Sequence, residues 1–221
     1  MPDLTKSGIY SIIITICEIC RKGLISFMKK WHKWALIIIV IVGVLVSIKS
    51  CMDKRDADIV MAYIGDGFVD RELFTNNVDI LQSVCSDINN DGEVYVDMME
   101  ISFNESLSQA DKQNSEGKLA NAIGAGVARV YFMDEKYVVN NASSGVFCDL
   151  SHLGEGFKNA EGETVAISIK GNEKAKLLGV DTDGDIYIAV RLVSEIDTLT
   201  DKNIQKKHTQ AMEIAKFILN D

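Results

Sequence analysis

Proline, histidine and basic residues are scarce in this sequence. One proline stands among 221 residues, and it is Pro2, so no proline-rich linker divides the chain. Lysine and arginine number 23 against 32 aspartate and glutamate, which gives a net charge of −9. Because binding to a phosphate backbone needs a basic surface, we expect no nucleic-acid partner. Hydrophobic residues make up 47% of the chain, a share typical of a packed protein rather than a disordered one.

The sequence also lacks the common motifs of catalysis. It has no G-x-x-x-x-G-K-[ST] phosphate loop, no H-E-x-x-H zinc helix and no G-x-S-x-G nucleophile turn. Gly124-Ala125-Gly126 closes a predicted helix and opens a predicted strand, which reverses the order that a dinucleotide loop requires. Scattered carboxylates could still form a general acid and base, but no pattern singles out a pair. We therefore expect a protein that is not an enzyme.

One long apolar run stands near the start of the chain. Residues 34–48 read WALIIIVIVGVLVSI and carry no charge. As a helix this run is about 22 Å long, and Trp31 and Lys49 at its flanks extend the span to about 28 Å, close to the thickness of a bilayer core. We predict a transmembrane helix over 34–49, with the lipid bilayer as partner. The alternative is a buried part of a soluble core, but no flanking segment could cover so uniform a run.

The distribution of charge predicts how this helix is oriented. Residues 1–33 carry a net charge of +4, and residues 56–221 carry −15. Basic residues stay on the cytoplasmic side, so we expect a cytoplasmic leader over 1–33, a linker over 50–56 and an extracytoplasmic domain over 57–221 of a single-pass protein. The apolar stretch 9–20 of the leader is too short to span a bilayer and suits an interfacial helix.

Two processed forms are the alternatives to an uncleaved anchor. A cleaved signal peptide fits poorly, because the basic leader is long and no A-x-A site follows the apolar run. Cys51 is placed where a lipidated cysteine would stand in a lipoprotein. The preceding Ile48-Lys49-Ser50, however, puts a lysine where small neutral residues are expected.

The extracytoplasmic part alternates between strand and helix patterns and has no internal repeat. Apolar strands followed by amphipathic helices imply right-handed crossovers, so we predict an α/β fold with three layers and a mostly parallel sheet. One helix pattern is clear: Phe74, Val78, Leu81, Cys85 and Ile88 form a single stripe. The predicted strands cover residues 57–64, 93–103, 127–133, 164–169 and 185–193, and the predicted helices cover residues 70–86, 115–125 and 202–219.

The order strand, helix, strand, followed by residues 118–138 and 145–150, resembles a known family over most of the outer part of the chain. Gly126, the strand Val130–Asp134 and the return Gly145–Leu150 are similar to the first lobe of the extracytoplasmic solute-binding proteins of bacterial ABC transporters. The resemblance implies a single periplasmic-binding-protein lobe, with a transporter as a possible partner. Two such lobes need roughly 300 residues, so the second lobe has no counterpart here, and the ligand residues of the family cannot be transferred.

The segment Asp87-Ile88-Asn89-Asn90-Asp91-Gly92-Glu93 has the oxygen-bearing side chains of a calcium loop. Asp87, Asn89, Asp91 and Glu93 would converge on the cation, and Gly92 would allow the sharp turn. Position 12 is Met98 rather than a bidentate acid. The helix–loop–strand context resembles the calcium loop of sugar-binding periplasmic proteins, in which a distant glutamate completes the shell. The alternative is a turn in which Asp and Asn side chains bind the local backbone.

Three aspartates follow predicted strands and are candidate ligand-binding residues: Asp66, Asp134 and Asp149. Another acidic segment, 181–185, is expected to be a simple turn. Cys85 and Cys148 are expected to be buried small apolar residues, and a disulfide between them is the alternative.

Two functions fit these patterns. The first is a non-enzymatic, membrane-anchored protein whose acidic domain contacts other proteins or material of the cell envelope. The second is a receptor or sensor module that binds a solute or calcium and is related to transporter substrate-binding proteins.

Overall fold

The computed structural model of the protein describes residues 56–220, which form one compact unit. The predictions for the leader, the transmembrane helix and Cys51 lie outside these residues. Within them, no helix has both the length and the hydropathy needed to cross a bilayer. The elements of this unit are, in chain order, β1 (Ile59–Gly65), α2 (Arg71–Asn77), η1 (Val78–Ser83), β2 (Val96–Ser102), α3 (Gln109–Leu119), η2 (Ala120–Gly124), β3 (Val130–Asp134), α4 (Glu135–Asn141), η3 (Ala142–Ser144), β4 (Phe157–Lys158), β5 (Thr164–Ser168), α5 (Glu173–Leu177), β6 (Ile186–Val190), α6 (Glu195–Thr200) and α7 (Ile204–Leu219).

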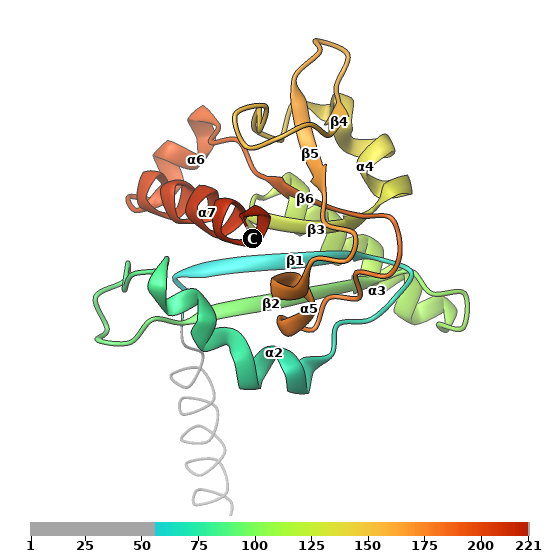
Figure 1. Ribbon diagram of the computed structural model, residues 1–221, viewed down its shortest axis with the longest axis horizontal. Coiled ribbons are helices and arrows are strands. Elements are labelled where there is room, and N and C mark those ends of the chain that lie inside the picture. Colours follow the sequence, from blue (N-terminus) through green and yellow to red (C-terminus); the bar gives the residue numbers. More distant parts are fainter. Residues whose placement is uncertain (1–55, 221) are drawn as a thin grey trace, which may run out of the picture. The chain divides into compact units, whose positions relative to one another are not determined.

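The strands form one mixed sheet in the order β2-β1-β3-β6-β5-β4 (Figure 1). Strand β1 pairs in parallel with both β2 and β3, as the alternating strand and helix patterns predicted. The remaining pairs, β3–β6, β6–β5 and β5–β4, are antiparallel. Parallel neighbours need a long crossover, usually a helix that packs on the sheet, whereas antiparallel neighbours need only a turn or a short loop. The expectation of a mostly parallel sheet therefore holds only for the first half of the domain.

Helices cover both faces of the sheet, which gives the expected three layers. Side chains alternate along each strand, so Met61 and Tyr63 of β1 face α2, α5 and α7. Ala62 and Ile64 of the same strand face the layer formed by α3, η2 and α4. Figure 1 shows α2, α5 and α7 in front of the sheet and α3 behind it. The two buried clusters are contiguous with the sheet, which explains why the central strands β1, β3 and β6 are almost wholly apolar.

The helix predicted over residues 70–86 is confirmed, with a change of helix type in its second half. Asp70 caps it, because its carboxylate accepts hydrogen bonds from the backbone N–H groups of Glu72 and Leu73 at 3.0 Å each. After Asn77 the chain tightens into the 3₁₀-helix η1. The apolar stripe of the sequence is buried in the core, with Val78 only partly covered.

Two expectations about individual elements were wrong. Helix α3 begins at Gln109 rather than near Ser115, because the Ser108 hydroxyl accepts the N–H of Asp111 and starts the helix earlier. The alternation of apolar residues with Tyr187, Ala189 and Arg191 in the sequence predicts a half-exposed strand, but β6 is covered on both faces. Ala189 is fully buried, and the following Arg191 is buried too.

Candidate functional site

The connections around β1 create a point where the winding of the sheet reverses. The chain leaves β1 through α2, on one face, to reach β2. It then passes through α3, on the other face, to β3 on the opposite side of β1. In open α/β sheets, ligands bind beyond the carboxyl ends of the strands at such a reversal. The carboxyl ends of β1 and β3 are therefore the place to look for a site.

Asp66 and Asp134, two of the three predicted ligand residues, meet at this place. The backbone N–H of Asp66 donates to Asp134 Oδ2 at 2.7 Å. The Tyr63 hydroxyl donates to Asp134 Oδ1 at 3.3 Å and accepts the N–H of Gly67 at 3.1 Å. Gly65 leaves room for these bonds, because a Cβ there would displace the Tyr63 hydroxyl and Asp134 Oδ1. These bonds fasten the loop after β1 to the end of β3.

The exposed side of this cluster carries one charge of each sign. Lys136 Nζ lies 2.5 Å from Asp66 Oδ2, and the two side chains are each about half exposed. Tyr137 donates its hydroxyl to Asp66 Oδ1 at 3.4 Å, and its ring lies 4.9 Å from Lys136 Nζ. Phe103 stacks on the Tyr137 ring with centroids 5.2 Å apart. An ammonium, a carboxylate and an aromatic surface thus open to solvent side by side.

The partly buried position of Asp134 affects its protonation. Burial, together with the nearby Asp66 charge, raises the pKa of Asp134, although the Asp66 N–H and the Tyr63 hydroxyl stabilise its charged form. Burial also raises the pKa of Tyr63, as does the charge on Asp134. The hydrogen bond to Asp66 raises the pKa of Lys136, so this ammonium stays charged at neutral pH. Asp134 holds the loop, and Asp66 and Lys136 are available to a ligand.

Asp149, the third predicted ligand residue, lies at the opposite ends of the strands from Asp66 and Asp134. Its carboxylate accepts the N–H groups of Ser151 and Thr164 at 2.9 and 3.1 Å. Bonds from the Ser151 backbone and hydroxyl lower its pKa. Thr164 begins β5, which runs in the same direction as β1 and β3, so Asp149 is at the amino ends of these strands. The structure does not bring it together with Asp66 and Asp134.

The predicted calcium loop is closed by its own backbone. Asp87 Oδ1 accepts the N–H of Asn90 at 2.6 Å, and Asp87 Oδ2 accepts that of Gly92 at 2.8 Å. Asn89 Oδ1 accepts the N–H of Asp91, and Asp91 Oδ1 accepts that of Glu93. Both Asn90 and Gly92 have positive φ. These bonds are the local turn that was the alternative for this segment, and calcium binding stays a prediction.

A buried aspartate that the sequence did not single out ties this loop to the sheet. Asp58 is fully buried, and its carboxylate accepts the N–H groups of Ile88, Asn89 and Tyr95 at 2.7 to 3.0 Å. Asp58 directly precedes the apolar strand β1. An acidic residue at the start of an apolar run is the feature of the sequence that could have pointed to this role. Among residues 56–220, no three His, Cys, Asp or Glu residues are grouped as metal ligands would be.

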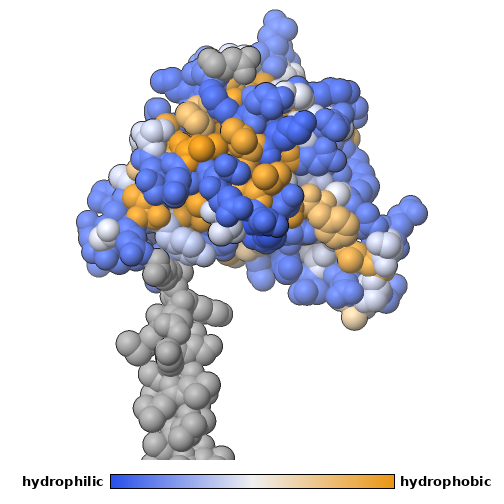
Figure 2. Space-filling view, turned by 60° about the horizontal axis from the view of Figure 1, so that its bottom comes forward, coloured by the Kyte–Doolittle hydropathy of each residue, from blue (hydrophilic) through white to orange (hydrophobic). Residues whose placement is uncertain are grey.

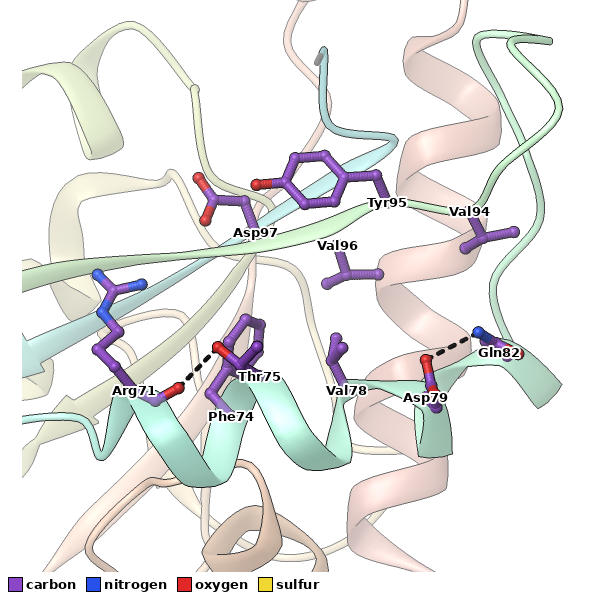
Figure 3. A pocket seen from close by; sticks show the side chains of 10 residues that line it. All are labelled: Arg71, Phe74, Thr75, Val78, Asp79, Gln82, Val94, Tyr95, Val96 and Asp97. Atoms are coloured by element: carbon purple, nitrogen blue, oxygen red, sulfur yellow. Dashed lines mark hydrogen bonds between the residues drawn. The ribbon is translucent and has the colours of Figure 1, made fainter. Parts of the chain in front are cut away.

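One cavity lies between α2 and the outer strand β2. It has a volume of about 250 Å³, and Phe74, Val78 and Val96 project into it (Figure 3). Figure 2 looks towards the side of the molecule that carries α2, where apolar side chains gather in the middle and hydrophilic ones surround them. The cavity is lined by neither Asp66, Asp134 nor Asp149.

A larger cavity, of about 460 Å³, lies at the amino ends of the strands. Its wall includes a buried ion pair in which Arg129 Nη1 lies 3.4 Å from Asp197 Oδ2. Arg191 Nε approaches the same oxygen at 3.7 Å, and its guanidinium donates to the carbonyl of Ile123. No sequence pattern predicts this cluster, because Arg129 lies 68 residues before Asp197. Gly126, which lines the cavity, lies directly against the Arg191 guanidinium.

The two cysteines in the described part of the chain are buried free thiols. Burial raises the pKa of both Cys85 and Cys148 to about 12. Both belong to the apolar cluster on the α2 side of the sheet, as expected for small apolar residues.

Comparison of the chain with protein-family models, curated proteins and solved structures finds no match.

Proposed function

We propose that this chain is a non-enzymatic binding module held at a membrane by residues 34–49, with its α/β domain on the extracytoplasmic side. The apolar run and the charge difference between residues 1–33 and 56–221 support the tether. The winding reversal at the ends of β1 and β3 supports a solute site in the domain. A transporter or another envelope protein would detect the bound state, as the resemblance to solute-binding proteins implies.

The exposed pair Asp66 and Lys136 is the observation that carries the solute site. Opposite charges placed side by side suit a small solute that has both a cationic and an anionic group. The carboxylate would take the cation and the ammonium the anion, each in a charge-assisted hydrogen bond. The stacked rings of Phe103 and Tyr137 offer an apolar surface beside these charges. The Asp134 carboxylate already accepts hydrogen bonds that hold the loop after β1. This favours binding over acid–base chemistry at the carboxyl ends of β1 and β3.

A single-lobed domain would bind such a solute at the exposed carboxyl ends of β1 and β3, without closure of a second lobe. Fewer groups then surround the solute, so we expect weaker binding than in a two-lobed protein.

The test is calorimetric titration of the full chain in lipid nanodiscs. The panel is a set of zwitterionic amino acids and betaines, with the matching amines and carboxylic acids as singly charged controls. We expect at least one zwitterion to bind more tightly than its singly charged counterparts. Because each charged hydrogen bond is worth about 1.5–3 kcal/mol, Asp66→Asn and Lys136→Ala should each weaken binding about tenfold or more.

Lys207→Ala provides a matched control, because Lys207 also forms an ion pair with an aspartate, Asp201, at 2.8 Å. It lines the cavity at the opposite edge of the sheet. The Lys207→Ala variant should bind the zwitterion with the same affinity as the parent chain. Absence of heat across the panel, or equal weakening by all three substitutions, would contradict the proposed site. Repeating the titration with calcium and with EDTA tests the acidic loop in the same experiment.

A further inference from the structure

Helix α6 exposes the two most solvent-accessible large apolar side chains among residues 56–220. Ile196 is 71% exposed and Leu199 is 85% exposed. Residues three apart lie on the same side of a helix, so these two side chains project together. Val127, which is also exposed, lines the cavity beside this helix.

The opposite side of α6 is fixed to the domain. Ser194 and Asp197 form a capping box at its start. Asp197 is buried and pairs with Arg129 and Arg191. A helix held by its buried carboxylate in this way cannot turn Ile196 and Leu199 inward. Their exposure is therefore a fixed property of the folded domain.

Helix α6 lies close to the point where the described chain begins. Asp56 and Asp197 line the same cavity of about 460 Å³. Figure 1 shows α6 and the start of β1 at the same end of the molecule. Only six residues, 50–55, separate Asp56 from the predicted transmembrane helix, and six extended residues reach about 20 Å at most. If residues 34–49 span the bilayer as proposed, a linker of this length would limit how far this end of the domain can lie from the lipid.

Charges of both signs border the apolar pair of α6. Glu195, Lys202 and Lys206 are exposed, and the long lysine side chains can extend along an apolar contact to place their ammonium groups among lipid headgroups. The apolar area is too small for a second copy of the chain, since a stable dimer needs about 800 Å² from each partner. Two side chains supply only part of that area.

We propose that α6 is a membrane-contact element, with Ile196 and Leu199 inserted at the bilayer interface. This inference rests on the tether in the proposed function and not on the solute site. It adds the orientation of the domain: the amino ends of β1 and β3 face the lipid, and their carboxyl ends face away from it.

The test is fluorescence quenching in the full chain reconstituted in anionic vesicles that contain spin-labelled lipid. Cys17, Cys20 and Cys51 are first replaced by serine. Cys85 and Cys148 are retained, because they are buried and their raised pKa keeps them unreactive. A fluorophore is then placed on Leu199→Cys in one sample and on Val139→Cys in another. Val139 is 53% exposed on α4, which begins at the carboxyl end of β3.

We expect quenching at position 199 to exceed that at position 139 by at least a factor of two. With a fluorophore on Lys202→Cys, the double variant Ile196→Ser and Leu199→Ser should lose this excess. Equal quenching at 199 and 139 in a chain that floats with vesicles overturns the membrane contact and leaves the tether standing. A chain that does not float overturns both. Quenching that is weak at 199 while the chain cross-links to itself there would assign the surface to a second copy instead.

Discussion

Asp197 joins helix α6 to the rest of the domain at the amino ends of the strands. Its carboxylate faces two buried guanidinium groups, and an asparagine in its place would remove the negative charge that both of them approach. Removing one partner of a buried ion pair typically costs about 3–5 kcal/mol. We expect Asp197→Asn to lower the free energy of unfolding by about this amount, measured by urea unfolding of the full chain in a mild non-ionic detergent at pH 7.

The loss of stability caused by Asp197→Asn should also depend on pH. Burial alone would raise the pKa of Asp197, but the Ser194 backbone N–H and the Arg129 guanidinium outweigh it and hold the pKa below its usual value. A carboxyl with a lowered folded pKa adds stability above the unfolded value of about 3.9 and loses that contribution as the pH falls through the folded value. The difference between the parent chain and Asp197→Asn should therefore shrink below about pH 4.

Asp185→Asn is the matched control for this substitution. Asp185 pairs with Lys170 at 3.0 Å, but both side chains are about 60% exposed. Exposed pairs contribute about 0–1 kcal/mol, so this variant should unfold almost as the parent does. If the two variants lost equal stability, the buried cluster would not have the role assigned to it.

Single residues at the site were predictable only where they directly follow a strand. Asp66 and Asp134 were found in this way, since strand ends of a parallel sheet share an edge. Tyr63 was read as one more core residue, because a strand pattern cannot show that a hydroxyl lies at the rim. Lys136 belongs to a helix too short to predict. Asp149 follows a segment that pairs with Arg191 through a single bridge at Phe147 and belongs to the other edge.

At the level of elements, length decided what the sequence could reveal. The long strands and α7 have clear periodicity, so their existence and approximate limits were predicted correctly. Helices α4, α5 and α6 have seven residues or fewer. Such helices are not stable alone and form only because the rest of the domain packs against them and caps them. No local sequence pattern predicts these helices, and the sequence analysis did not predict α6 for this reason.

Two glycines in different elements should respond in opposite ways to alanine. Gly117 lies inside α3 with open space around it, and alanine is better than glycine in a helix by about 1 kcal/mol. Gly179 has φ +75°, and a Cβ there would overlap the Asp70 carbonyl oxygen. We expect Gly117→Ala to raise the free energy of unfolding by about 1 kcal/mol and Gly179→Ala to lower it by about 1–3 kcal/mol.

Urea unfolding followed by circular dichroism measures both glycine variants. A stabilising Gly179→Ala would mean that the loop between α5 and β6 moves away from Asp70, to which Gly179 is joined by a backbone hydrogen bond of 2.9 Å. Gly117→Ala shows at the same time that the assay detects a gain in stability.

For the whole molecule, the property to test first is the proposed extracytoplasmic location of the domain. Protease added to intact cells should remove the acidic domain and leave a fragment that contains the leader. This follows from the charge difference across residues 34–49. Immunoblotting with tags at both termini measures the outcome. Digestion of the leader with the domain protected would reverse the proposed topology, and a full-length chain in the soluble fraction would exclude the anchor.

The fold class of the whole domain was predictable from the sequence, but the direction in which its strands pair was not. Alternating apolar strands and amphipathic helices were enough to predict three layers. The direction of the later strands depends on contacts between segments far apart in the chain, such as β3 with β6. Sequence patterns record burial rather than direction, so the antiparallel half could not be distinguished from a continued parallel one.

The direction of β1 also separates the two proposed surfaces electrically. The strand has seven residues, which at about 3.3 Å each hold its ends roughly 23 Å apart. The field of charged lipid decays over about 8 Å at physiological ionic strength. With α6 on the bilayer, Asp66 and Lys136 would stand beyond almost all of that field, so the lipid composition of the membrane could change without altering how a solute is held at the far rim.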